Sequence, residues 1–234
     1  EGKYDLAIYK NDYRDWGLNF ELEGGEVQRL TYPLLIPKVL DAKAAYTYDS
    51  SPSLVTQSPD RRWVLTSVAN SLTSYIQFDL NTLSDKDKLP SEKALAFSPD
   101  LFTKADGAHS LELVEWSNDN KHLIAKHVYT GGFEFVLLNQ EKPEESANLN
   151  RLFSQTPANV ALIDKKYDKF YLLNEPGGQL STADLKTKQV TPFLSGVGTF
   201  KSYGEDTLVY SVPIPNSSYQ KIMLREGKNT YNLR

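Results

Sequence analysis

The fold of this chain is decided at residues 58–67, which read SPDRRWVLTS: a turn followed by a strand. Serine and aspartate side chains can hydrogen-bond the amides of their own turn, and proline fixes φ at the corner. The next residues, Trp63-Val64-Leu65, are aromatic, β-branched and apolar, as expected in a buried strand. The stretch therefore predicts two strands joined at a sharp corner. We interpret the corner residues as structural and not as an active-site signature.

Related turn-and-strand units recur along the chain. They begin at Ser58, Ser117, Asp164 and Gly204, so that the spacing falls from 59 to 47 to 40 residues. A period near 40–50 residues is typical of the blades of a β-propeller. Each unit has the pattern of four strands, of which the second is the most hydrophobic. The polar fourth strands are expected at residues 92–98, 147–154, 189–195 and 230–234.

The predicted fold is all-β, with a three-stranded N-terminal meander followed by about four propeller blades. The predicted domains are a meander at residues 1–38, a linker at 39–52 and the repeats at 53–234, divided into 53–100, 110–155, 159–197 and 198–234. Four is the smallest number of blades in a closed propeller, so an open ring, or blades beyond Arg234, is also compatible with the pattern. The competing fold is a β-sandwich made from the same strands.

The repeats at residues 50–234 resemble the TolB-type, WD40-like propeller repeat, in which Ser-Pro-Asp-Gly marks the same turn. Arg61 stands here in place of the glycine, and only the first unit has the complete Ser-Pro-Asp.

The first 38 residues contain three stretches that alternate with a period of two, as half-buried strands do. Tight turns are expected at residues 10–12 and 24–25, and the apolar positions are Tyr4, Leu6 and Ile8, then Trp16, Leu18, Phe20 and Leu22, then Val27, Leu30, Tyr32 and Leu34. This meander resembles the second half of a PEGA domain, on residues 2–6, Lys10, Tyr13, Trp16, Leu22, 24–26 and Val27. The resemblance implies an extracytoplasmic β-sandwich of the bacterial or archaeal envelope. Asp12 departs from the family's usual glycine, and the Pro-Glu-Gly-Ala stretch is absent.

Composition excludes several classes of function. The net charge is −4, and no run of Lys and Arg is long enough to follow a phosphate backbone, so nucleic acid is not expected as a partner. There is no cysteine, which excludes disulfides, thiolate metal sites and cysteine nucleophiles. No uninterrupted apolar run reaches the length of about 18 residues that a membrane-spanning helix needs. Because the chain begins at Glu1 and not at Met, we expect it to be part of a longer protein, and membrane attachment only through a segment outside it.

The sequence predicts no catalytic residue, no metal site and no cofactor. His122 and His127 lie five apart near one strand, which places them on opposite faces, and with His109 they are expected at the surface. The acidic loops at Asp85–Asp87 and Asp100–Asp106 lack the spacing of a calcium loop. No Gly-x-Ser-x-Gly elbow is present. A glycosidase with two carboxylates from different blades stays open.

The function favoured by the sequence is a non-enzymatic interaction module of the cell surface that binds protein or glycan through one propeller face. The alternative is the propeller domain of a glycoside hydrolase or peptidase. Loops that link the second and third strands share one face, and such loops carry function on a rigid frame. The candidate ligand-binding residues in or beside these loops are Asn70, Ser74, Tyr129, Phe133, Glu175, Gln179, Asn216 and Tyr219.

Overall fold

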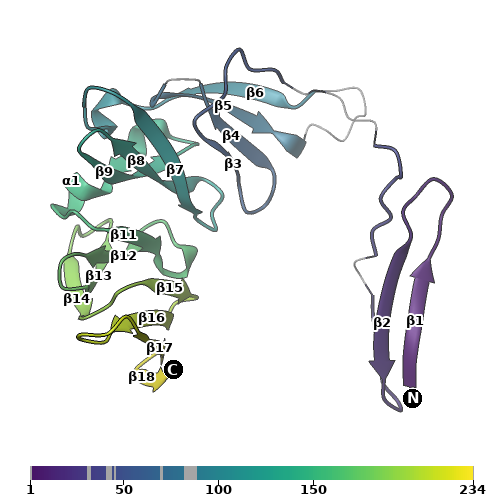
Figure 1. Cartoon of the computed structure of the whole chain (residues 1–234). Helices are drawn as coiled ribbons and strands as arrows, with labels where there is room; N and C mark the ends of the chain where they lie inside the picture. The colour runs from purple at the N-terminus through teal and green to yellow at the C-terminus, as the bar shows by residue number, and fades with distance from the viewer. Residues whose placement is uncertain are drawn as a thin grey trace. The chain divides into compact units, whose positions relative to one another are not determined.

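The computed structural model describes residues 2–30, 33–40, 44, 46–68, 71–81 and 89–233. The chain forms two compact units, Glu1–Thr47 and Tyr48–Arg234, and each is described by itself. Strands dominate both units (Figure 1). Within the described residues, no helix has the length and apolar character needed to cross a membrane.

The first unit is a two-stranded hairpin. Strands β1 (Gly2–Ile8) and β2 (Trp16–Leu22) pair antiparallel, and the rings of Tyr4 and Phe20 stack across the pair with their centroids 5.9 Å apart. The predicted third strand is wrong for residues 23–30 and 33–36, which form no strand. Val27 is 90% exposed, so its alternating pattern has no core to face. Prolines also interrupt this stretch, and they cannot donate to a ladder.

The second unit contains four antiparallel sheets of four strands, each in chain order, which we call blades 1 to 4. Blade 1 comprises β3 (Val55–Gln57), β4 (Trp63–Ser67), β5 (Ser74–Asp79) and β6 (Ser91–Ala96). Blade 2 comprises β7 (His109–Trp116), β8 (His122–Tyr129), β9 (Gly132–Asn139) and β10 (Ala147–Asn148). Blade 3 comprises β11 (Asn159–Leu162), β12 (Lys169–Asn174), β13 (Gln179–Asp184) and β14 (Val190–Leu194). Blade 4 comprises β15 (Phe200–Tyr203), β16 (Thr207–Pro213), β17 (Gln220–Glu226) and β18 (Asn229–Asn232).

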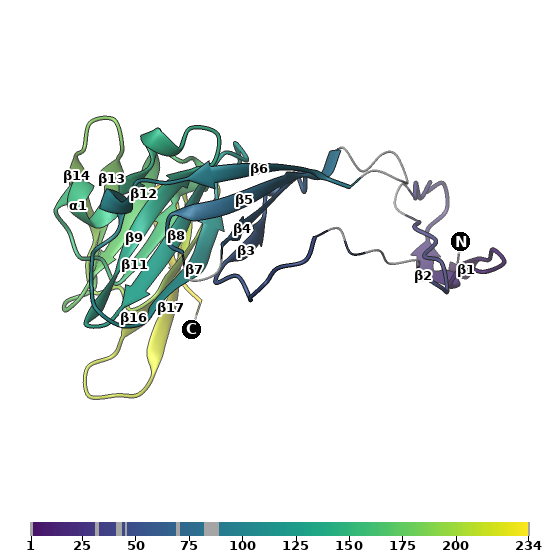
Figure 2. The same ribbon diagram turned by 90° about the horizontal axis from the view of Figure 1, so that it is seen from above.

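The blades follow one another along an arc, with blade 1 at one end and blade 4 at the other (Figure 1). Figure 2 looks down this stack, so that the last three blades lie one behind another. The prediction of an all-β chain with repeated four-stranded antiparallel units is therefore confirmed. The β-sandwich alternative is wrong, because the strands form four separate sheets and not two facing ones.

The hydrophobic core lies between successive blades. Three clusters of buried side chains join blade 1 to blade 2, blade 2 to blade 3, and blade 3 to blade 4. Neighbouring residues of one second strand pack against different blades. In β12, Phe170 packs toward blade 2, whereas Tyr171 packs toward blade 4. A strand buried on both faces needs a continuous apolar run. This explains the hydrophobic second strands of blades 2 and 3, which have a neighbouring blade on each side.

The repeated turns have the structural role predicted for them. The Ser58 hydroxyl donates to Asp60 Oδ1 at 2.5 Å and accepts from the Trp63 amide at 3.0 Å, while Asp60 Oδ1 also accepts from the Arg62 amide at 3.0 Å. Arg61, where the repeat usually has glycine, adopts a positive φ of 64°. The equivalent turns of blades 2 and 4 have Asn120 and Gly204 in the same left-handed region. The corner of blade 1 is thus closed by its own side chains.

The fourth strand predicted for blade 2 is wrong beyond Asn148. After the short β10, the chain forms helix α1 (Leu149–Phe153). The Asn148 side chain caps this helix by accepting from the Arg151 amide, and Leu149 and Phe153, four residues apart, are both buried. Local capping therefore overrides the strand pattern. Short 3-10 helices also occur, among them Pro99–Leu101, Pro143–Glu145 and Ile163–Lys165.

Candidate functional site

The strands of each blade run alternately up and down, so the connections between them gather at two opposite ends of the blade. The repeated turns and the hairpins between third and fourth strands lie at one end, which we call the turn face. The loops between second and third strands and the segments between blades lie at the other end, which we call the loop face. Seven of the predicted ligand-binding residues lie in these loops or at the adjoining strand ends: Ser74, Tyr129, Phe133, Glu175, Gln179, Asn216 and Tyr219. Asn70 lies outside the described residues.

These seven residues are spread over four blades and do not form one site. Tyr219 is 76% exposed and Phe133 is 38% exposed, whereas Tyr129 and Gln179 are half-buried. Glu175 borders a cavity of about 640 Å³ between blades 3 and 4, which is lined largely by glycine and proline. The predicted positions thus lie on the loop face, but they do not surround one common site.

The loop face has a groove between blades 1 and 2, made of two adjoining cavities. The first, about 570 Å³, is rich in hydroxyl groups, from Ser51, Ser53, Ser71 and Thr73. The second, about 260 Å³, is more apolar, with Leu72, Pro99 and Phe102 in its walls. Leu72, Thr73 and His109 border both cavities. We call this pair of cavities the loop-face groove; the sequence analysis did not identify it.

One wall of the groove is supported by a buried network around His127 and Glu134. His127 is wholly buried, and its Nδ1 lies 2.9 Å from Glu134 Oε1, while its Nε2 lies 2.8 Å from His109 Nδ1. The other nitrogen of His109, Nε2, lies 2.8 Å from the carbonyl oxygen of Ala105. The network therefore connects strands β7, β8 and β9 to the segment at residues 97–108 that links blades 1 and 2, which we call the connecting segment.

Glu134 is held in its ionised form. Burial alone raises the pKa of this carboxyl group, but hydrogen bonds from His127, Thr103 and Asn148 outweigh burial and lower the pKa to about 2. The Thr103 amide donates to Oε1 at 2.6 Å, and its hydroxyl donates to Oε2 at 2.7 Å. Asn148 Nδ2 donates to Oε2 and to the Leu101 carbonyl, both at 2.8 Å. A single buried carboxylate thus fixes the connecting segment to blade 2.

The prediction of surface histidines is wrong for His122 and His127, which are both buried, and His109 is half-buried. The two do lie on opposite faces of β8: His122 stacks on Tyr167 of the following blade, with ring centroids 3.9 Å apart. A signal for part of the network was present in the sequence. The Thr130-Gly131 turn sets the hairpin register that places His127 opposite Glu134.

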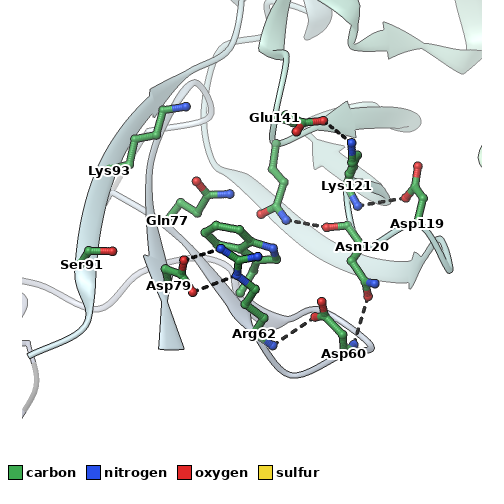
Figure 3. A pocket seen from close by; sticks show the side chains of 12 residues that line it. Asp60, Arg62, Gln77, Asp79, Ser91, Lys93, Asp119, Asn120, Lys121 and Glu141 are labelled. Carbon is green, nitrogen blue, oxygen red and sulfur yellow. Dashed lines mark hydrogen bonds and ion pairs between the residues drawn. The ribbon is translucent and has the colours of Figure 1, made fainter. Parts of the chain in front are cut away.

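The turn face has a polar cavity of about 520 Å³ between blades 1 and 2, and Figure 3 shows charged side chains from both blades around it. Arg62 binds Asp79 through two hydrogen bonds, at 3.0 and 2.7 Å. Lys121 binds Glu141 at 2.6 Å. The Asp60 amide donates to Asn120 Oδ1 at 3.0 Å and so ties the two blades together.

Three carboxylates of this turn-face cavity, Asp79, Asp119 and Glu141, are poor candidates for the proton donor of a glycosidase. The hydrogen bond from Arg62 lowers the pKa of Asp79, and the hydrogen bond from Lys121 lowers the pKa of Glu141. Burial raises the pKa of Asp119, but hydrogen bonds from the amides of Lys121 and His122 and from the His122 ring more than compensate, so this pKa is lowered too. A general acid requires the opposite direction, a raised pKa. Among the described residues, no group of three or more His, Asp or Glu side chains could hold a metal ion.

The fold defines a β-propeller-like module, an assignment that rests on the order and packing of its own four sheets. No protein-family model matches the sequence, and no curated protein matches it significantly.

Among solved structures, the chain is similar to a putative TolB from Agrobacterium tumefaciens, at 10% identity and a TM-score of 0.49, over 98% of this chain and 76% of that one. It is similar to the β-propeller domain of the Trilobed protease from Pyrococcus furiosus, at 15% identity and a TM-score of 0.45, over 99% of this chain and 67% of that one. It is also similar to a puromycin-hydrolyzing peptidase from Mycobacterium tuberculosis, at 13% identity and a TM-score of 0.45, over 77% of this chain. The chain spans only 28% of that peptidase.

Proposed function

We propose that this chain is a non-enzymatic interaction module of the cell envelope, and that it binds an extended polypeptide segment in the loop-face groove. The observation that carries the proposal is the adjoining pair of cavities, one rich in hydroxyl groups and one more apolar, both bordered by His109. An extended peptide has the matching character, because its backbone offers hydrogen-bonding groups while its side chains alternate between two sides. The larger cavity lies within the usual volume range of ligand sites, about 300–1,000 Å³.

A peptide suits this groove better than a glycan does. Sugar rings pack well on exposed aromatic faces, and the one aromatic ring in the groove's described lining, Phe102, is only 4% exposed. The more apolar cavity offers small aliphatic surfaces instead, from Leu72 and Pro99. These suit an alkyl side chain of a peptide.

The envelope location is part of the same proposal. Its support is the resemblance of residues 2–27 to half of a PEGA domain; within these residues β1 and β2 pair antiparallel. The alternative function, the propeller domain of a hydrolase, has less support, since the pKa values of Asp79, Asp119 and Glu141 in the turn-face cavity are lowered. A screen with generic glycosidase and peptidase substrates tests it: turnover that is abolished by changing one carboxylate would favour the enzyme.

The binding proposal is tested by selecting ligands from a random peptide library on phage and measuring the selected peptides by fluorescence polarisation. Ala108 is exposed and borders the larger cavity, so Ala108→Trp fills the groove without altering the core. We expect this change to weaken binding by about tenfold or more, which corresponds to about 1.4 kcal/mol. The matched control is Ala94→Trp, at an exposed alanine of β6 outside the groove's lining. Peptides that bind Ala108→Trp as tightly as the wild type, or binding to a glycan array alone, would reject the proposal.

A further inference from the structure

We propose that His109 and His127 share one positive charge when the connecting segment is docked, and that loss of this proton releases residues 104–108 from the loop-face groove. The inference rests on the proposed function only where it concerns ligand binding; the charge and the release concern the chain alone. The protonation state of the histidine pair thereby regulates the shape of the loop-face groove.

The positive charge follows from counting hydrogens. The carbonyl oxygen of Ala105 can only accept, so His109 Nε2 must carry a hydrogen. The ionised carboxylate of Glu134 can also only accept, so His127 Nδ1 must carry a second. The remaining contact, His109 Nδ1 to His127 Nε2 at 2.8 Å, needs a third hydrogen between the two nitrogens. Two neutral imidazoles have only two N–H groups, so one of the two rings is an imidazolium.

The same count predicts what happens when the proton leaves. A neutral pair has two N–H groups for three contacts, so one contact fails. The bond to Glu134 is charge-assisted and wholly buried, and such bonds are about twice as strong as neutral ones. The contact that fails is therefore the one between the two rings or the one from His109 to Ala105. In either case His109 no longer links Ala105 to the buried carboxylate.

The connecting segment has a second attachment that does not depend on this proton. Thr103 remains bonded to Glu134 through its amide and its hydroxyl. Arg151 of helix α1 donates to the Asp100 carbonyl, and its guanidinium lies 3.7 Å from Glu134 Oε2. Glu134 thus keeps a cationic neighbour after deprotonation of the histidines. Release is confined to residues 104–108, which lie between the Thr103 attachment and strand β7.

Other titratable and charged groups near the network do not replace the shared proton. Phe102 lies edge-on to the His127 ring and covers it with hydrocarbon, at a centroid distance of 5.4 Å. Burial raises the pKa of Tyr75 in the same hydrophobic cluster, so that its hydroxyl stays neutral. Glu134 from β9, Arg151 from α1 and Tyr129 lie beside the network. Lys104 borders the same cavity as His109, and Tyr75 from β5 belongs to the same hydrophobic cluster as Phe102.

The release of residues 104–108 alters the groove directly. Lys104 and Ala105 border the smaller cavity, and Gly107 and Ala108 border the larger one. Both cavities therefore lose a wall when these residues move away from blade 2. A ligand that needs both walls binds less tightly at the higher pH, and ligand binding in turn favours the protonated pair.

The first test needs no variant and no ligand. Long-range ¹H–¹⁵N NMR on histidine-labelled protein distinguishes imidazolium from neutral rings, and histidine charge changes between about pH 5 and pH 8. At about pH 5.5 we expect the signature of one imidazolium in the His109–His127 pair. The backbone amides of Ala105 and Ala108 report the release: their order parameters should fall from about 0.85 to below about 0.6 at about pH 8, while that of Ala94 stays unchanged. Two neutral rings at about pH 5.5, or rigid backbone amides at Ala105 and Ala108 at about pH 8, would overturn the inference.

Two variants assign the response to the right histidine. His109→Gln keeps a side-chain donor for Ala105 but does not titrate, so the order parameters of Ala105 and Ala108 should no longer change with pH. His122→Gln is the matched control, because His122 pairs with Asp119 at the other end of the same strand. An unchanged pH response in His109→Gln, or its loss in His122→Gln, would contradict the proposal. If no peptide binds but the NMR results hold, the proposed function fails and the proton-dependent segment stands.

Discussion

Removing the charge of Glu134 should destabilise the second unit by an amount that depends on pH. The pKa of this carboxyl group is lowered from 4.5 to about 2 by its hydrogen bonds. A difference of about 2.5 in pKa corresponds to about 3 kcal/mol at neutral pH, at about 1.36 kcal/mol for each pKa unit. Because the folded-state pKa is the lower one, this stabilisation is present above about pH 4.5 and is lost as the pH falls toward 2. At about pH 3, less than half of it remains.

The perturbation is Glu134→Gln, and the measurement is urea-induced unfolding at pH 7 and at about pH 3. We expect the variant to lose about 3 kcal/mol at pH 7 and about 1.4 kcal/mol at about pH 3, so that the two unfolding curves approach each other on acidification. The matched control is Glu141→Gln, which removes an exposed carboxylate paired with Lys121. Its free energy of unfolding should stay close to that of the wild type. Equal stabilities of wild type and Glu134→Gln at pH 7, or a difference that grows in acid, would refute the reasoning.

Three further substitutions test the joins and turns, each by thermal unfolding. Asn148→Ala removes the cap of α1 and two buried hydrogen bonds, to Glu134 and to Leu101, and should cost about 2–3 kcal/mol; a cost below about 1 kcal/mol would mean that the capping contact alone matters. Trp116→Phe removes the buried bond from Nε1 to Thr56 Oγ1, 2.7 Å long, between blades 2 and 1, and should cost about 1–2 kcal/mol. Arg61→Gly relieves the left-handed backbone at φ 64° and should raise stability by up to about 1 kcal/mol; a lower melting temperature would contradict this.

The turns could be predicted from sequence because their chemistry is local. Ser58 and Asp60 satisfy the amides of their own corner, and in the apolar run that follows, Leu65 is buried against blade 2. The prediction of a third strand in the first unit was wrong, although it too rested on a local pattern. Alternation at Val27 and Leu34 is also a local pattern, but a strand needs a partner, and residues 23–30 and 33–36 do not pair with the β1–β2 hairpin as a strand. Periodicity predicts which residues suit a strand and not whether one is paired.

The histidine network could not be predicted, because its members come from distant parts of the chain. His127 and Glu134 meet through a hairpin register that the sequence indicates, and His109 and Asn148 lie on the outer strands of the same blade, whereas Thr103 reaches Glu134 from the connecting segment. The sequence placed the candidate ligand residues on the loop face and missed the groove, since the groove is bordered by the connecting segment between blades. Segments between repeats carry no periodic signal of their own.

The connecting segment explains why an ionised network is buried at this join. Residues 97–108 contain only one short 3-10 helix, and most of their backbone has no strand to pair with. A segment of this length is uncommon in a compact domain unless it is functional, and it must be tied down to form the wall of a groove. An apolar join would stabilise the fold at least as well, because a buried ion pair is seldom more stable than hydrocarbon of the same volume. The carboxylate and the paired imidazoles do what hydrocarbon cannot: they fix the segment through directional bonds, one of which depends on a single proton.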